Sequence, residues 1–191
     1  MIAAILKLVE WLFGQLTKKR TTVSPFEEAP YRIHVPRSLM HEMRNITRPN
    51  EKRGEPLAFL LSRFASEDSR TILVGIEAIP FPDCAYIDGP AGANFDTEWA
   101  VKIANEQIGA NVGLLLVHSH GGKGMPDFSS VDQQTNRTVM GALAIGIRTA
   151  PYGAIVLSDT DARCVLSVAR ASMIVRVIVV PDRLGEMRVT A

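Results

Sequence analysis

A continuous apolar run, Val112–Val117, leads directly into His118-Ser119-His120. An apolar run of this length predicts a buried β-strand. Successive side chains of a strand point to opposite faces, so residues two apart point the same way. His118 and His120 are therefore expected to direct two imidazoles at one place, at the end of a buried strand.

An S-x-x-D pair follows the histidines. Ser129 is expected to open a helix, with Asp132 in its first turn, after the glycine-containing loop Gly121–Phe128. The same spacing is typical of a helix N-terminal cap, and both roles can hold together. Two imidazoles and one carboxylate leave a fourth tetrahedral position for water, as in catalytic zinc sites. The pattern predicts a metal site formed by His118, His120 and Asp132, with Ser129 beside it.

Hydrolysis at such a site also requires a carboxylate that lies near the metal without binding it. The candidates before the histidines are Glu42, Glu51, Glu55, Glu67, Glu77, Glu98 and Glu106. Glu55 precedes the expected strand Leu57–Phe64, so it can lie at the rim of a sheet. Glu77 is in the middle of a strand, where it can occupy the solvent face. Spacing alone does not choose between these two.

The remaining pattern mixes strands and helices, which predicts a mixed α+β domain of the α/β type. Thr21–Tyr31 is expected to be a linker, and Val35-Pro36-Arg37-Ser38 to start a helix that ends near Thr47. The other expected helices are Asp96–Gly109 and Ser129–Ile147, and the other expected strands are Thr71–Ile79, Tyr152–Leu157, Arg163–Val168 and Met173–Val180. A chain of 191 residues is one domain with extensions. We place that domain at residues 25–191.

Residues 1–24 are expected to form an amphipathic helix and a linker. Its apolar residues recur at three- and four-residue spacing: Ile2, Ile5, Leu6, Val9, Leu12, Phe13 and Leu16. Lys7 and Glu10 interrupt the run, which argues against a spanning helix. The basic cluster at 18–20 follows the apolar run, opposite to the order of a secretory signal. The helix can pack on its own domain, on a twin subunit, on a membrane surface or on another protein.

Charge and cysteine content narrow the functional class. Lys and Arg number 21 against 20 Asp and Glu, so the net charge of +1 creates no global field for nucleic acid. Cys84 and Cys164 cannot make a disulfide framework, which favours a reducing compartment, the cytoplasm. His41-Glu42 begins like a zinc-protease H-E-x-x-H helix, but Asn45 replaces the second histidine, so that motif fails.

The combined motif resembles that of the JAMM (MPN-plus) zinc metalloproteases, in particular bacterial members of the Prok-JAB type. Their signature is an upstream glutamate, then H-x-H, a seven-residue spacer and S-x-x-D, which His118-Ser119-His120 and Ser129-Ser130-Val131-Asp132 match. The segment Glu55–Ser62 is similar to the family's E-x-x-G-x-L-x-G, with Ala58 and Ser62 in place of the glycines. The spacer here has eight residues, one more than usual. In the order of its elements the resemblance covers residues 31–170.

The resemblance implies a fold and a set of roles. The fold would be the JAMM/MPN fold, a curved mixed β-sheet flanked by helices, with the N-terminal amphipathic helix as an addition. One Zn²⁺ per chain would be bound by His118, His120 and Asp132. Glu55 would transfer the proton from water to the leaving amine, and Ser129 would stabilise the oxyanion.

The resemblance also implies a substrate. The family cleaves isopeptide or peptide bonds after the C-terminal glycine of ubiquitin or ubiquitin-like proteins, in precursor processing or deconjugation. The substrate tail would extend along a strand edge, with Pro80–Phe95 and Gly121–Phe128 as clamps. Bacterial members are often encoded beside ubiquitin-like proteins and their activating and conjugating enzymes, including in antiviral defence operons. Those enzymes are therefore expected partners, without nucleic acid or membrane contact.

Three alternatives stay open at this stage. The same hydrolysis can act on a sulfur-carrier protein or an unrelated peptide, because specificity lies in loops. The chain can be a metal-free MPN scaffold that only binds partners, although it retains all the expected ligands. It can also be a membrane-tethered adaptor that uses the N-terminal helix.

Overall fold

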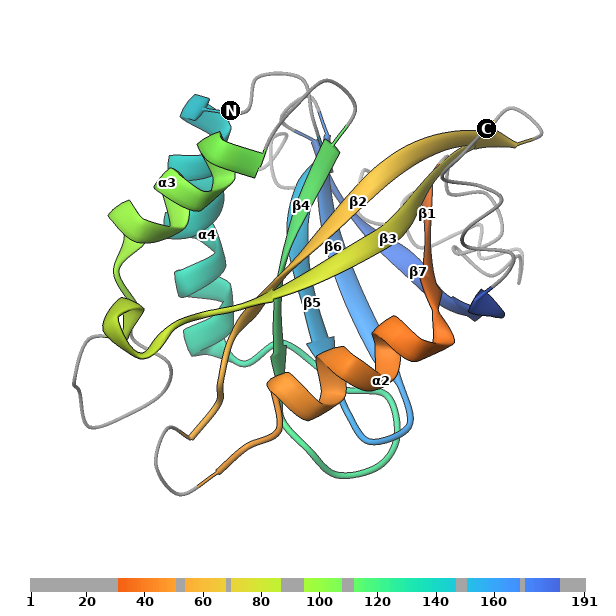
Figure 1. Ribbon diagram of the computed structural model, residues 1–191, viewed down its shortest axis with the longest axis horizontal. Helices are drawn as coiled ribbons and strands as arrows, with labels where there is room; N and C mark the ends of the chain where they lie inside the picture. The colour runs from red at the N-terminus through yellow and green to blue at the C-terminus, as the bar shows by residue number, and fades with distance from the viewer. Residues whose placement is uncertain are drawn as a thin grey trace, which may run out of the picture.

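Seven strands form a closed barrel in the computed structural model, which describes residues 31–50, 54–67, 70–86, 95–107, 112–146, 151–168 and 171–182 (Figure 1). The strands are β1 Tyr31–Pro36, β2 Ala58–Glu67, β3 Arg70–Pro80, β4 Val112–Ser119, β5 Tyr152–Leu157, β6 Ala162–Val168 and β7 Ala171–Val180. Their order around the barrel is β1-β3-β2-β4-β5-β6-β7. The strands expected from periodicity are all present, within a few residues of their predicted ends.

The expected fold, a curved mixed sheet flanked by helices, is wrong, because the sheet closes on itself. Strand β1 causes the closure: it pairs in parallel with β3 through Tyr31–His34 and with β7 through Arg32–Pro36. We expected a linker and a helix start in this segment. It is short and contains a proline, so its periodicity is weak, and only its two partner strands define it as β-structure.

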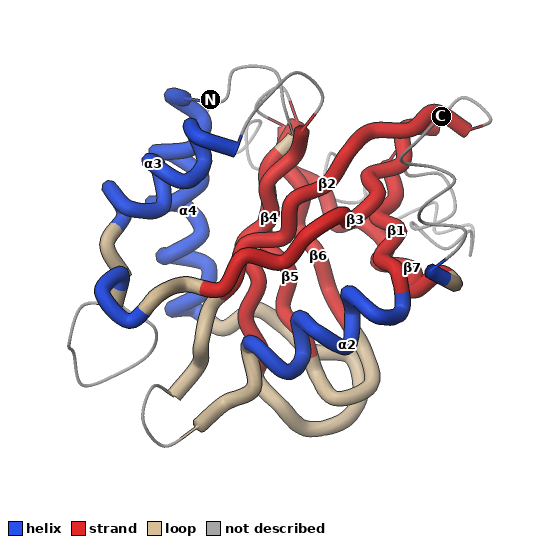
Figure 2. The backbone as a smooth tube through the Cα atoms, viewed as in Figure 1, coloured by secondary structure: helices blue, strands red, loops and turns tan. Residues whose placement is uncertain are grey.

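The helices of the described chain occupy two places (Figure 2). Helix α2, Arg37–Ile46, packs Leu39, Met40 and Met43 into the cluster that fills the barrel. Helices α3, Thr97–Gln107, and α4, Ser130–Gly146, lie side by side against the outer face of the barrel. A short 3₁₀ turn, Asp83–Ala85, precedes α3.

Strand β4 is buried on both faces, which explains its continuous apolar sequence. Leu115 and Val117 point into the barrel cluster. Leu114 and Leu116 point outward into a second cluster that contains Phe59, Phe81, Ala100 of α3 and Val139 of α4. The aromatic rings of Phe59, Phe81 and Trp99 pack within this second cluster, with ring centroids 4.6 to 6.4 Å apart. The outer layer therefore depends on β4 as much as the barrel does.

Gly153 allows β4, β5 and β6 to approach closely. A Cβ atom added at this position would overlap the carbonyl oxygen of Val165 and lie 3.0 Å from Leu115 Cδ2. Because the obstacle is backbone, we expect Gly153→Ala to destabilise the fold by about 1–3 kcal/mol or more, as overpacking does. For a chain of this size that lowers Tm by about 2–4 °C per kcal/mol. Thermal unfolding followed by circular dichroism measures the change.

Gly75→Ala is the matched control. Its added Cβ would meet only leucine side-chain carbons, of Leu60 at 3.1 Å and Leu39 at 3.2 Å. Those side chains can rotate, so the loss should be smaller. Equal Tm values for Gly153→Ala and the parent would contradict the close packing described here.

The predicted N-terminal helix and linker, residues 1–24, and the domain start at residue 25 lie outside the described residues. Among the helices in the described ranges, none has both the length and the apolar character needed to cross a bilayer.

Candidate metal centre

The two histidines of the motif lie at the end of β4 and point the same way. The outward row of Leu114 and Leu116 continues through His118 and His120, toward the start of α4. Their Nε2 atoms are 3.2 Å apart. The side chain of His118 is 5% exposed and that of His120 is 26% exposed, so one imidazole is enclosed and the other borders solvent.

Asp132 lies between the two imidazoles. Its Oδ1 is 3.2 Å from Nε2 of His118, and its Oδ2 is 3.1 Å from Nε2 of His120. The carboxylate is held by the cap of α4: the Ser129 backbone N–H donates to Oδ2 at 2.6 Å, and the Asp132 N–H donates to Ser129 Oγ at 3.1 Å. The cap therefore orients the carboxylate, as the S-x-x-D spacing suggests.

Glu55 joins this group through the register of β2 and β4. These strands are antiparallel and pair Ala58 with Val117, so the residues before Ala58 lie beside those after Val117. Glu55 Oε1 is 4.0 Å from His120 Nε2. One ligand atom each of Glu55, His118, His120 and Asp132 lies within 4.8 Å of the others.

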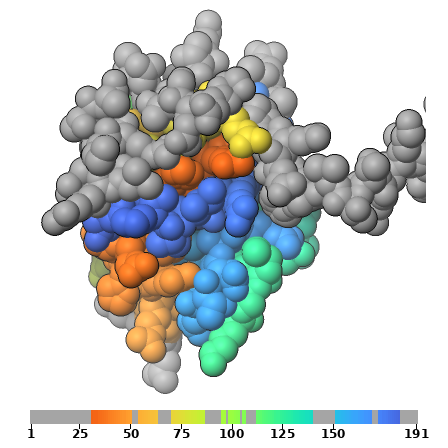
Figure 3. All heavy atoms as spheres, turned by 90° about the vertical axis from the view of Figure 1, so that its right-hand side faces the viewer, coloured from red at the N-terminus to blue at the C-terminus, as the bar shows by residue number. Residues whose placement is uncertain are grey.

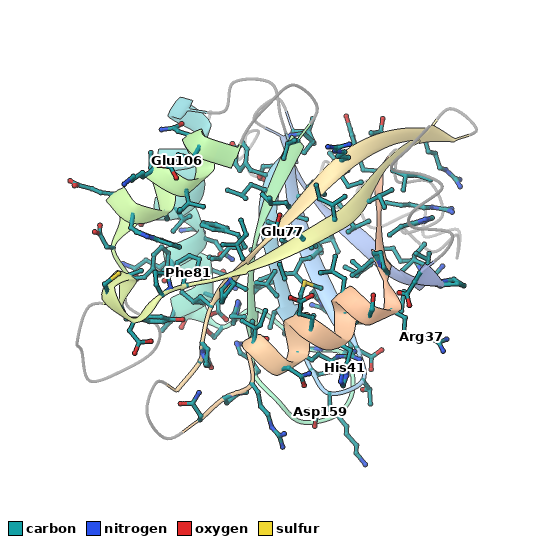
Figure 4. All side chains as sticks on the ribbon, in the orientation of Figure 1. Arg37, His41, Glu77, Phe81, Glu106 and Asp159 are labelled. Carbon is teal, nitrogen blue, oxygen red and sulfur yellow. The ribbon has the colours of Figure 1, made fainter. Side chains whose placement is uncertain are left out.

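The alternative glutamate, Glu77, is far from this group. It lies on the exposed side of β3, paired with Leu61, and β2 separates β3 from β4. Leu61 in turn pairs with Leu114, four residues or about 13 Å along β4 from His118. Figure 4 shows Glu77 near the middle of β3, and His41 on α2, where its side chain is exposed.

The other candidates lie outside this group or outside the described residues. Glu42 and Glu98 are exposed on helices, and Glu106 pairs with Lys102 at 3.9 Å. Glu51 and the side chain of Glu67 lie outside the described residues.

The surroundings of Asp132 keep its carboxylate charged, as binding of a cation requires. Burial by itself raises the pKa of this acid, but hydrogen bonds with His118 and Ser129 and the attraction of the His118 ring outweigh it. The pKa of Asp132 therefore lies well below its ordinary value, and the group is charged at neutral pH.

The spacing of the three ligands fits a single metal ion. Ligand atoms about 2.0–2.1 Å from one tetrahedral ion lie about 3.3–3.4 Å from one another. The two Nε2 atoms are 3.2 Å apart, which is close to that edge length. Asp132 places a different carboxylate oxygen near each of them, Oδ1 at 3.2 Å from His118 and Oδ2 at 3.1 Å from His120. Glu55, at 4.0 Å, is outside the set. His118, His120 and Asp132 can therefore hold a metal ion, and Glu55 borders the open side.

The loop between the histidines and α4 is anchored by the turn after β5, a contact that sequence reasoning missed. The Asp159 N–H donates to the carbonyl of Gly122 at 2.8 Å. The Ser158 hydroxyl donates to the carbonyl of Gly124 at 2.7 Å, and Arg163 pairs with Asp127 at 2.7 Å. Residue spacing carries no signal for these contacts, because the partners are more than thirty positions apart.

This loop also bears on the eight-residue spacer. Phe128, its last residue, packs on the outer cluster, and its ring centroid is 6.1 Å from that of His118. The additional residue therefore does not keep Asp132 from reaching both histidines. Of the other expected clamp, Pro80–Phe95, residues 87–94 lie outside the described residues.

Comparison of the sequence with known protein families and with curated proteins finds no match.

Metal binding should stabilise the fold, because the ligands come from β4 and α4, which are brought together only in the native state. A ligand at one hundred times its Kd adds about 2.7 kcal/mol, which raises Tm by about 5–10 °C in a chain of this size. We expect that shift on adding Zn²⁺ to chelator-treated protein, with reversal by EDTA, in a thermal-shift assay. Zn²⁺, Mn²⁺, Co²⁺ and Ni²⁺ all leaving Tm unchanged would contradict the site.

Proposed function

We propose that the protein is a JAMM-type zinc peptidase that cleaves after the C-terminal glycine of a ubiquitin-like protein. One observation carries the proposal: two imidazoles and one carboxylate lie close enough to share an ion, with a second carboxylate, that of Glu55, beside them. The arrangement supports hydrolysis, because it combines an open metal position with an adjacent base. The proposal rests on the site and not on the barrel.

Zinc is the metal that we propose for this donor set. Two neutral imidazoles and one carboxylate form a three-ligand set that catalytic zinc ions use, whereas Mg²⁺ and Ca²⁺ prefer all-oxygen sites. When bound, zinc supplies Lewis acidity, which lowers the pKa of water and polarises a carbonyl.

Each residue then has a role that follows from its position. His118, His120 and Asp132 bind the ion. Glu55, partly exposed at the open side, accepts a proton from water and returns it to the leaving amine. Ser129 accepts a backbone N–H at its Oγ, which leaves its own O–H able to donate to an oxyanion.

The cell compartment that we propose is reducing. Cys84 is exposed and Cys164 is buried, and both are free thiols. Burial raises the pKa of the Cys164 thiol far above its ordinary value, so this thiol stays protonated and unreactive. Free thiols are typical of a cytoplasmic protein.

Incubation of the zinc-loaded protein with a panel of ubiquitin-like proteins tests the activity. Each panel member carries a C-terminal extension after its terminal glycine, and a sulfur-carrier protein is included. We expect one class to lose its extension at the glycine, as read by intact mass, and EDTA to stop the reaction. Cleavage of the sulfur carrier alone would assign the site to that substrate. No cleavage of any extended protein, with zinc bound, would overturn the proposal.

A further inference from the structure

A groove that combines arginines with exposed apolar side chains lies where β7 parts from β6. It measures 530 Å³, and the residues that matter here are Arg44, Arg163, Arg176, Met125, Ile174 and Val179. We call it the β7 groove. Figure 3 shows β7, in dark blue, at the surface, with green residues of the loop after β4 below it.

The apolar residues of this groove are unusual in their exposure. Met125 is 59% exposed, Ile174 52% and Val179 46%. In the described part of the chain, Val131 is the other large hydrophobic side chain exposed to this degree. Isolated exposed apolar residues are ordinary, but a group lining one hollow is typical of an interaction site.

The lining of the groove carries more basic than acidic side chains, with Arg44, Arg163 and Arg176 against Asp161. Arg176 is exposed on β7, and Arg32 lies directly opposite it on β1. Arg44 donates its Nε to the backbone carbonyl of Ser158 and so keeps its full charge. Arg163 is partly offset by Asp127. The overall charge of the chain is only +1, so this cluster is a local feature.

The groove also leads toward the metal centre. A second hollow of 350 Å³ shares Arg163 and Ile174 with it and continues to Arg137 of α4 and to Phe128. Phe128 in turn contacts the ring of His118. A chain bound along both hollows would thus pass beside the metal ligands.

The strand pairing favours an extended polypeptide as the occupant. In β7, Ala171–Val175 pair with β6, whereas Arg176–Val180 pair with β1. Among the described residues, the second half of β7 therefore has no strand partner on the side of the groove. This half of β7 offers main-chain groups and alternating side-chain positions over about 17 Å. An extended segment of five or six residues can pair with a strand edge of that length.

We propose that the β7 groove binds an extended polypeptide segment that carries acidic and apolar side chains. That this segment belongs to the substrate rests on the proposed function, whereas its binding does not. Single-stranded nucleic acid fits less well, since it requires aromatic stacking platforms, and Phe128 is the aromatic side chain that these two hollows offer.

Fluorescence anisotropy with two labelled octapeptides tests the proposal on the full chain. In one peptide glutamate alternates with leucine, and in the other lysine alternates with leucine. We expect the glutamate peptide to bind at least about tenfold more tightly, with an affinity that falls as salt is raised. Arg176→Glu should weaken it by about tenfold, and Ile174→Ser should also weaken it.

Arg63→Glu is the matched control, because Arg63 is exposed on β2, away from the groove, and should leave affinity unchanged. Arg137→Glu, on α4, is a second charge-reversal variant, to be used if Arg176→Glu fails to fold. Equal binding of the two peptides, or parental affinity in both reversal variants, would overturn the proposal. So would tight binding of a labelled oligonucleotide that displaces the peptide, or self-association of the chain that Arg176→Glu abolishes.

The same protein separates this proposal from the proposed function. If the glutamate peptide binds in the presence of EDTA but no extended ubiquitin-like protein is hydrolysed, the proposed peptide site stands and the proposed enzymatic activity is rejected. If cleavage depends on zinc but the protein does not prefer the glutamate peptide, the proposed enzymatic activity stands and the proposed peptide site is rejected.

Discussion

Glu55→Gln should abolish hydrolysis while the metal stays bound. The amide keeps the size of the side chain but cannot take up a proton, and a positioned general base contributes about 10²–10⁴-fold to the rate. Because Glu55 Oε1 lies 4.0 Å from His120 Nε2, outside the three-ligand set, zinc affinity should be nearly unchanged. The cleavage rate of an extended ubiquitin-like protein and the zinc content by metal analysis measure the two effects.

Glu77→Gln is the control for this result. Its carboxylate is exposed on β3, with a whole strand between it and β4, so the variant should cleave like the parent. An active Glu55→Gln beside an inactive Glu77→Gln would show that the base is assigned to the wrong residue. Zinc loss in Glu55→Gln would instead identify Glu55 as a fourth ligand.

Removing a ligand should have the second large effect. His118→Ala or Asp132→Ala deletes one of three groups that lie 3.1 to 3.2 Å from their neighbours. Loss of an outer hydrogen-bonding partner alone lowers metal affinity by about 10–100-fold. We expect loss of a ligand to lower zinc affinity by more than that, and hydrolysis to disappear with it. Titration against a competing zinc chelator measures the affinity.

Asp132→Asn refines the same prediction. Its amide oxygen can still accept the Ser129 N–H, so the helix cap survives while the ligand charge is lost. Asp159→Asn, an exposed carboxylate on the neighbouring turn, should retain parental zinc affinity. Parental zinc affinity in Asp132→Asn or in His118→Ala would remove the three-ligand site.

The clustering of His118, His120 and Asp132 was predictable because the relevant signals are local. Alternation along one strand points His118 and His120 the same way, and a cap on one helix fixes Asp132 beside Ser129. Only the meeting of strand and helix had to be assumed, and it is accompanied by a shared hydrophobic cluster that includes Leu116 of β4 and Val139 of α4. The role of Ser129 as an oxyanion donor stays a prediction.

The choice of Glu55 over Glu77 lay beyond what spacing can show, and it follows from strand register. Pairing of Ala58 with Val117 sets the residues before one strand beside those after the other. Register is a property of two strands together, so one strand's pattern does not reveal it.

Periodicity and hydrogen bonds between near neighbours set the order of most strands and helices and the local geometry of the H-x-H and S-x-x-D pairs, so these features could be predicted from the amino-acid sequence. Three features are visible only in the folded barrel: the sheet closes through β1, Glu55 lies near the histidines, and Arg163 and the turn after β5 hold the loop before α4. Those features join residues far apart in the chain, and only the packing of the whole barrel selects such contacts.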